Sequence, residues 1–485
     1  MEPSKLKDHV FKKGKFTTPL NTIMTPLNDD DSWSYGRLPE YLWIGLVLKK
    51  YGRSVGLEKI YKIILILHEL APDLFAPRMS DVLSLESPVQ ASFYEQVLTI
   101  MPKDTIAPLT LLLTQSKYPV FAEFFCTPTL DIKRRQDVIL ETMQNLMDHQ
   151  TYEATDIRFV VLYFELISGR LNILKEQGDL LREYPTLDHA NEKMRMIRPM
   201  IRSMEMMSLH LEKINKEYIT LFWGGISKMT DCNLFTIKFK NEDKDIATYL
   251  EQLHEVFIYL SQLFTSVNPL DEKMKVILGI ATYSYKRFKE AANHNLFNSI
   301  SGRGCIRVMI ENYIMLKYLL KKESEHQNIW REYQYYGLGL YKLVLARHRE
   351  CQDLNVTSHF DKDYIEALVN EFIIEESVDM DTRYFDQQNI RLKAEAVNEK
   401  DLFGLYYDYD SSFEHGLWGA IRESSLVKCH NPAHQYHCVP DVDDNNNLKS
   451  VLPDCIMIMR KTLMLLNELY GLPDALYEEV KNFDV

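Results

Sequence analysis

Residues 299–322 read SISGRGCIRVMIENYIMLKYLLKK, a run of apolar side chains at helical spacing that no proline interrupts. Apolar residues that recur every three or four positions predict one amphipathic helix over the whole stretch. The same spacing extends outward in both directions from Leu38 onward, divided by prolines and polar runs into helices of roughly ten to twenty residues. No internal repeat, glycine-rich phosphate loop or long alternating strand pattern is present, so the sequence predicts an all-α protein.

The helical pattern is weakest at residues 223–235, WGGISKMTDCNLF, where paired glycines and polar residues interrupt it. A chain of 485 residues is too long for one ordinary core. We therefore expect an irregular arm at 1–33, an N-terminal helical domain at 34–230 and a C-terminal helical bundle at 235–485. That bundle would carry one long loop rich in cysteine and histidine, 429–450.

The composition argues against several classes of protein. A formal net charge of −13 and a pI near 5.6 do not suit a surface that binds duplex nucleic acid, although a local basic pocket could still accept RNA or a small anionic substrate. No apolar run approaches the ~20 residues that cross a bilayer, so we expect no membrane partner. Seven scattered cysteines and an N-terminus without the apolar core of a signal peptide favour a cytoplasmic protein with free thiols.

Arg307 and Glu311 fall within the apolar stripe of the 299–322 helix, on the side that also carries Ile314 and Tyr318. Their i,i+4 spacing lets them meet, and a buried charge must be paired. Because Arg before Glu is the less favourable order for helix stability, stability alone explains the pair poorly. The pattern indicates either a buried ion pair that fixes helix packing or a site role for Glu311.

A second helix is expected over 401–428, and it carries YYDYDSSFEHGLWGAIRES. On a helical wheel Asp408, His415 and Arg422 share one face, which offers groups that bind or transfer protons. Two glycines, Gly416 and Gly419, would each cost roughly 1 kcal/mol relative to alanine inside a helix. We therefore expect backbone or a ligand to pack closely against them; the alternative is a solvated polar face.

Residues 429–438, CHNPAHQYHC, place two cysteines and three histidines in ten positions. Pro432 excludes a continuous helix through that point. Asn431 followed by proline is instead typical of an N-cap and the first position of a helix. The sequence therefore predicts a short helix that begins at Pro432.

On that turn His434, His437 and Cys438 would share one side, and Cys429 lies just before the cap. A divalent transition metal such as zinc accepts nitrogen and sulfur donors of this kind, although the spacing matches no standard zinc finger. Three interpretations stay open: a transition-metal site, histidines that orient a phosphate or other polar substrate, and a structural turn.

Four segments together resemble a bacterial family of unknown function. They are RVMIENYIMLKYLL, WREYQYYGLGLYK (330–342), the Y…S…HG segment YYDYDSSFEHGLWGAIRES, and C-x-N-P-x-H-x-x-H, which starts at Cys429. The resemblance covers roughly 270–440 and brings no established activity. In the family pattern His430 and Cys438 are not members, which implies Cys429, His434 and His437 as the metal ligands.

The leading functional hypothesis is a hydrolase or nuclease with a composite site, in which Glu311 and His415 act as acid and base. Arg307 or Arg422 would hold an anionic group, and the cysteine and histidine loop would bind metal or substrate. One alternative is a non-enzymatic scaffold or sensor that binds a partner protein through its N-terminal domain. The other is a metal-independent RNase, because the S…HG segment is similar to helical-bundle RNases of toxin and phage-defence systems; their R-x4-6-H pattern is absent, since Arg422 follows His415.

Overall fold

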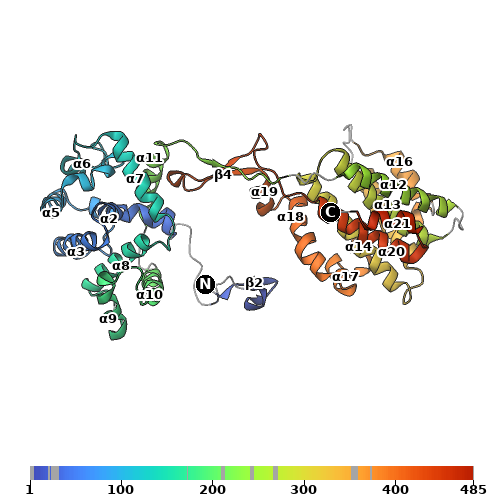
Figure 1. Ribbon diagram of the computed structural model, residues 1–485, viewed down its shortest axis with the longest axis horizontal. Coiled ribbons are helices and arrows are strands. Elements are labelled where there is room, and N and C mark those ends of the chain that lie inside the picture. Colours follow the sequence, from blue (N-terminus) through green and yellow to red (C-terminus); the bar gives the residue numbers. More distant parts are fainter. Residues whose placement is uncertain are drawn as a thin grey trace. The chain divides into compact units, whose positions relative to one another are not determined.

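The computed structural model describes residues 5–19, 22, 32–171, 173–208, 214–240, 245–265, 271–350, 359–371 and 374–483. The chain divides into two compact units, Met1–Phe235 with Lys428–Cys438, and Thr236–Val427 with Val439–Val485. Helices build both units, and the strands within these ranges are few and short (Figure 1). The protein is all-α, as predicted from its apolar periodicity.

The first unit includes Lys428–Cys438, which the sequence assigned to a C-terminal domain at 235–485. The physical reason is a strand pairing: β3 (Leu234–Phe235) runs antiparallel to β4 (Leu426–Cys429), with Leu234 opposite Cys429. Helical periodicity carries no information on such a long-range pairing. The sequence therefore could not show that Lys428–Cys438 packs with the first unit.

Part of the predicted arm at 1–33 is described. A 3₁₀ turn, η1 (Leu6–Asp8), leads into an antiparallel hairpin of β1 (Val10–Lys12) and β2 (Lys15–Thr17), which turns at Gly14 with φ +76°. The prediction for residues 1–4, 20–21 and 23–31 lies outside the described residues.

The first unit packs around α2 (Leu38–Tyr51), in which every residue from Leu38 to Leu48 is buried. Helices α3 (Arg53–Leu70), α7 (Ile132–Leu146) and α8 (Tyr152–Ile167) lie against it (Figure 1). The other helical elements are η3 (Trp33–Arg37), α4 (Met79–Leu83), α5 (Ser87–Ile100), η4 (Lys103–Thr105), η5 (Ala107–Leu111), α6 (Pro119–Phe125), α9 (Lys175–Glu183), η6 (Tyr184–Thr186), α10 (Met194–Ser208) and α11 (Lys216–Ser227).

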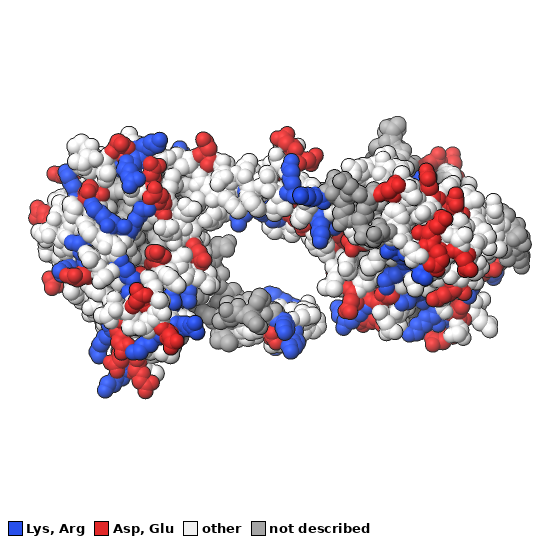
Figure 2. Space-filling model, viewed as in Figure 1, with Lys and Arg blue, Asp and Glu red and all other residues white. Residues whose placement is uncertain are grey.

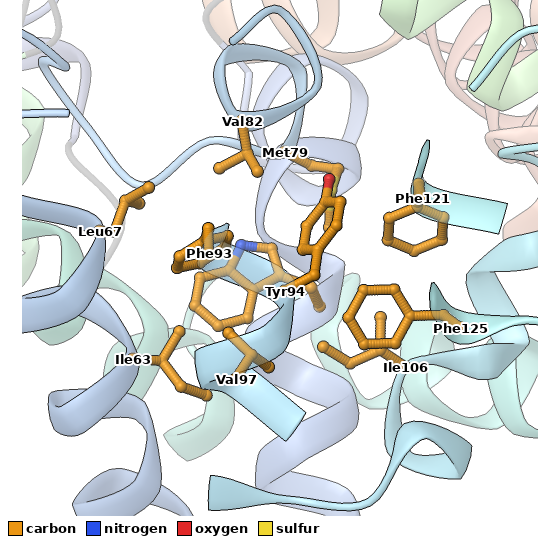
Figure 3. Close-up of a pocket in the computed structure, with 11 residues that line it drawn as sticks. Ile63, Leu67, Met79, Val82, Phe93, Tyr94, Val97, Ile106, Phe121 and Phe125 are labelled. Atoms are coloured by element: carbon orange, nitrogen blue, oxygen red, sulfur yellow. The ribbon is translucent and has the colours of Figure 1, made fainter. Parts of the chain in front are cut away.

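A small cavity of about 30 Å³ lies within this core, surrounded by apolar side chains that include Leu67, Val82 and Phe125 (Figure 3). Two of the lining side chains carry a polar atom of nitrogen or oxygen: the Tyr94 hydroxyl, whose pKa burial raises, and the indole nitrogen of Trp43, which donates to the carbonyl of Pro77. A cavity of this size has room for about one water-sized molecule, which would find too few polar partners there. The cavity is therefore a packing gap rather than a binding site.

The second unit packs around α14 (Ile300–Lys322), the helix predicted over 299–322, with Ser299 accepting a hydrogen bond from the Gly302 amide at its N-cap. Helices α13 (Glu272–Asn293) and α20 (Leu452–Tyr470) lie along it (Figure 1). The other helical elements are α12 (Ile246–Thr265), α15 (Ile329–Glu350), α16 (Lys362–Val369), η8 (Glu375–Ser377), η9 (Phe385–Gln387), α17 (Ile390–Ala396), η10 (Leu402–Tyr407), α18 (Asp408–Glu414), α19 (Trp418–Ser424) and α21 (Asp474–Lys481).

The single helix predicted over 401–428 is wrong. The segment forms a π-helical turn, η10, then α18, a break at Gly416 with φ +57°, α19, and finally strand β4. Because the helix breaks between His415 and Trp418, the common face predicted for Asp408, His415 and Arg422 does not exist. A left-handed backbone position accepts glycine far more readily than other residues, and this explains Gly416.

The surface shows both signs of charge on the visible face of each unit (Figure 2). This agrees with a chain that has 56 basic and 69 acidic residues. None of the helices in the described ranges combines the length and the apolar composition that a bilayer span requires.

Candidate functional site

The segment 429–438 folds as a compact knuckle of the first unit. Asn431 accepts a hydrogen bond from the Ala433 amide through its side chain and caps η11 (Pro432–His434), so the predicted cap and helix start are confirmed. The 3₁₀ turn ends at His434, because Gln435 and Tyr436 adopt left-handed backbone conformations with φ +54° and +51°. The chain then returns, and the Cys429 amide donates to the carbonyl oxygen of His437.

This path brings Cys429, His434 and His437 together. Cys232, which lies between α11 and β3, joins them. One donor atom from each of the four residues lies within 4.8 Å of the other three. The Cys232 Sγ atom lies 3.4 Å from Nδ1 of His434 and 3.4 Å from Nε2 of His437. The Cys429 Sγ atom lies 3.6 Å from the same His434 nitrogen. Two sulfur and two nitrogen donors thus face one point, a cluster that could hold a metal ion.

Backbone carbonyls orient both imidazole rings. Nε2 of His434 lies 2.9 Å from the carbonyl oxygen of Thr230 and 3.1 Å from that of Ser227. Nδ1 of His437 lies 3.1 Å from the carbonyl oxygen of His434. A carbonyl only accepts, so these nitrogens carry the protons and leave the lone pairs of the other ring nitrogens turned toward the thiols. Metal-binding histidines are held in the same way.

Asn431 fastens the knuckle to the chain around Cys232. Its side-chain amide donates to the hydroxyl of Thr230 at 2.6 Å and to the carbonyl of Asp231 at 2.8 Å. Its backbone amide donates to the Cys429 sulfur at 3.4 Å. The asparagine thus holds the two segments that supply the four donors in one arrangement.

The other two polar residues of the decapeptide lie outside the cluster. His430 stacks on Phe235 of β3 with a ring separation of 4.5 Å, and its amide donates to the carbonyl of Asn233. Cys438 begins β5 (Cys438–Pro440). The predicted common side of His434, His437 and Cys438 is therefore wrong for the cysteine, because the helical turn ends before it.

Sequence reasoning missed Cys232. The decapeptide offered three ligands that suited the family pattern, which fitted either a zinc site with an open position or a closed site with a fourth donor, and the sequence did not decide between them. Cys232 lies in the segment 223–235, which the sequence marked only as a domain boundary. Desolvation of the thiol and then the neighbouring Cys429 raise the pKa of Cys232. A bound cation would offset the electrostatic repulsion between the Cys232 and Cys429 thiolates.

A hollow of about 590 Å³ borders the cluster. Trp223 and Ser227 of α11 line it on one side, and His434, Gln435 and His437 of the knuckle line it on the other. Two of the candidate ligands therefore form part of a solvent-facing wall, and Cys232 itself is exposed while Cys429 is buried.

Arg307 and Glu311 meet in the second unit as predicted, with 3.7 Å between Nη1 and the nearer carboxylate oxygen. The hydroxyl of Tyr407 links them: it accepts from Arg307 at 2.7 Å and donates to Glu311 at 3.1 Å. Their side chains are 20% and 39% exposed, so the expectation of a buried pair is wrong. The helical wheel located the stripe but not its edge, where Glu311 reaches solvent.

His415 and Arg422 lie apart from that pair in the hydrogen-bond network. His415 is exposed at the C-cap of α18, and Arg422 donates to the carbonyl of Leu426. No hydrogen bond or ion pair joins either side chain to Glu311 among the residues that the structure describes. A Cβ built on Gly416 or Gly419 meets no heavy atom of the described residues within 4 Å beyond its local chain, so the predicted packing of backbone against these glycines is wrong. The alternative, a ligand at this position, stays a prediction.

Sequence reasoning also missed two buried cations of the second unit. The Arg303 and Asp410 side chains, 7% and 4% exposed, form an ion pair at 3.9 Å, and burial raises the pKa of Asp410 to about 7. Lys393 donates to the backbone carbonyls of Phe385 and Gln388, and burial lowers its pKa to about 8. Arg303 stands four positions before Arg307 and so lies on the same face of the helix. This spacing was a signal in the sequence that Arg303 is buried.

The family comparison concerns mainly the second unit. Residues 283–434 match a family of unknown function (DUF5677). The matched range agrees with the resemblance at roughly 270–440 and contains Arg307, Glu311, Cys429 and His434, but neither Cys232 nor His437. Neither the curated proteins nor the solved structures contain a match to the chain.

Proposed function

We propose that the protein binds one zinc ion through Cys232, Cys429, His434 and His437, and that this ion is structural. The observation that carries the proposal is the convergence of two sulfur and two nitrogen donors within 4.8 Å of one another. The backbone carbonyls on the far nitrogens of both histidines add support, because the free lone pairs then already face the cluster.

The donor set favours zinc over other cations. Two thiolates and two imidazoles suit Zn²⁺ in tetrahedral coordination, whereas Ca²⁺ and Mg²⁺ prefer oxygen ligands. Four protein ligands leave no open position for substrate, which is the pattern of structural rather than catalytic zinc. The ion would fasten the knuckle to the segment that follows α11, which is the segment containing Cys232.

Elemental analysis of the purified full chain, with a chelator competition, tests this proposal. We expect about one zinc per chain, and for Cys232→Ser a loss of affinity greater than the roughly 10–100-fold typical of outer-shell changes. Cys126→Ser is the matched control, because that cysteine is also exposed but lies outside the cluster. Absence of zinc from the wild type, or equal affinity in both variants, would contradict the proposal.

A hydrolase or nuclease activity in the second unit is the second candidate. A specific observation favours it: Glu311 is a partly exposed carboxylate that a phenol and a guanidinium hold in place. Glu311 would act as general base, Arg307 would stabilise an anionic group such as a phosphodiester of RNA, and His415 and Arg422 would assist at the same substrate. The zinc ion takes no part in this version of the site.

Incubation with total RNA and with a chromogenic phosphodiester tests the second candidate. Wild type should turn over at least one of them, Glu311→Gln should lose most of that activity, and Glu371→Gln, which changes an exposed glutamate of the same unit, should keep it. Equal rates for wild type and Glu311→Gln would remove the assigned base. No turnover of either substrate by any of the proteins would leave the helical unit without support for an enzymatic role.

A further inference from the structure

The two thiols of the metal cluster differ sharply in their surroundings. Cys232 is exposed, whereas Cys429 is buried with 0% of its surface accessible. Their sulfur atoms belong to the same set of donors within 4.8 Å. A reagent in solution therefore reaches Cys232 first, because the thiol of Cys429 is buried.

The other described cysteines lack this arrangement. Cys126 is exposed and Cys438 is half-buried, but neither belongs to the cluster of metal-ligating residues, and both Cys305 and Cys455 are buried. Peroxide oxidises the thiolate form of cysteine, which a bound cation would maintain at Cys232, and access to solvent decides which thiolate reacts first. A second sulfur within reach then converts the first oxidation product into a disulfide. Cys232 has both the access and the neighbour.

We propose that Cys232 is a site of reversible oxidation by hydroperoxides, with Cys429 as its resolving thiol, so that peroxide expels the metal ion from the knuckle. The proposal rests on the proposed zinc binding for the expelled ion. It adds to that site an oxidation chemistry, since a cysteine with access to solvent is open to oxidants whereas a buried one is inert.

The reaction balances with hydrogen peroxide as the oxidant. The Cys232 sulfur attacks one peroxide oxygen, the O–O bond breaks, and one water leaves, which yields a sulfenic acid. The Cys429 sulfur then attacks the sulfenic sulfur, the S–S bond forms, and the S–O bond breaks with release of a second water. In the zinc-loaded chain both sulfurs are thiolates, so two protons from solvent complete the two waters. The two thiolates lose two electrons in total, and one hydrogen peroxide gains them.

Formation of the bond requires a local rearrangement. The two sulfur atoms must close from a separation of at most 4.8 Å to about 2.05 Å. Sulfur engaged in a disulfide is a poor ligand, and two histidines alone hold zinc weakly, so the ion leaves. His434 and His437 also line the 590 Å³ hollow, so loss of the ion frees one wall of that hollow.

The test uses the zinc-loaded full chain and one equivalent of hydrogen peroxide. A chromophoric chelator reports released zinc, and peptide mass spectrometry under non-reducing conditions maps disulfides. We expect release of about one zinc per chain together with a Cys232–Cys429 disulfide, and recovery of zinc binding after dithiothreitol. Cys438→Ser, a matched control within the knuckle, should behave as wild type because that thiol lies outside the cluster.

Failure of this inference is distinguishable from failure of the zinc site. A protein that never holds zinc contradicts the proposed function itself. A protein that holds zinc and keeps it under peroxide, or that loses it while Cys232 and Cys429 stay reduced, overturns only the oxidation proposal. As a second variant, Cys429→Ser should accumulate a sulfenic acid at Cys232 that dimedone traps; no adduct at Cys232 would also overturn it.

Discussion

The Nε2 nitrogen of His434 lies 2.9 Å from the carbonyl oxygen of Thr230, two residues before Cys232 in the chain. This contact fixes which nitrogen of the ring carries the proton, and it ties the ring to the same segment that supplies the fourth sulfur donor. Hydrogen bonds within the protein therefore orient the two histidines of the candidate metal site without a bound ion.

Asn431→Ala should weaken zinc binding although Asn431 is not a ligand. The change removes both hydrogen bonds from its side chain to Thr230 and Asp231, which hold the two donor segments together. Outer-shell losses of this kind cost roughly 10–100-fold in metal affinity. Competition against a chelator of known affinity measures the change, and Gln435→Ala, in the same turn, serves as the control with an expected change of less than about threefold.

Two glycines in the same segment should respond in opposite ways to alanine. Gly416→Ala places a side chain at φ +57° and should destabilise the second unit by about 1–2 kcal/mol. Gly419→Ala lies inside α19 with open space around its Cβ and should stabilise by up to about 1 kcal/mol. Calorimetric unfolding midpoints decide the signs; a loss of stability at both positions would contradict the assigned break in the helix.

Glu40 should make the first unit less stable as pH rises. Burial raises the pKa of Glu40 to about 7, although Ser80 donates to it through both its amide and its hydroxyl. The folded state therefore binds this proton more tightly than the unfolded chain, and the stabilisation present at low pH is lost as pH rises from about 4.5 to 7.

Between pH 5 and 8 this group should cost on the order of 2–3 kcal/mol. Glu40→Gln should remove that dependence, while Glu69→Gln at an exposed position of α3 should retain it. Hydrogen-exchange protection of the α2 amides, corrected for intrinsic rates, measures the difference. Parallel pH profiles for wild type and Glu40→Gln would show that Glu40 titrates normally.

The parts of the fold that follow from local pattern were predictable. The 299–322 helix, the Asn431 cap and the Arg307–Glu311 pairing each depend on residues at most four apart, and the structure contains all three. The helix break at Gly416 was not predicted because apolar residues keep helical spacing on both sides of it, so the pattern looks like one continuous helix. Glu311 emerged half-exposed because a helical wheel shows which residues share a stripe but not where the neighbouring helices end.

The candidate metal site was predictable only in part. Cys429, His434 and His437 lie within nine residues of one another, and one sulfur and two nitrogen donors at such short spacing indicate a metal site. Cys232 lies about 200 residues earlier, and nothing local distinguishes it from the other scattered cysteines. A strand pairing between Leu234 and Cys429 brings the segments together, and such pairings depend on tertiary structure rather than on sequence period.

X-ray absorption at the zinc edge of the purified full chain tests the metal centre most directly. We predict a first shell of two sulfur atoms at about 2.3 Å and two nitrogen atoms at about 2.0–2.1 Å. His434→Ala should replace one nitrogen or lose the metal, whereas His430→Ala, whose ring stacks on Phe235, should leave the spectrum unchanged. A shell without sulfur, or a chain that takes up no zinc, would contradict the account.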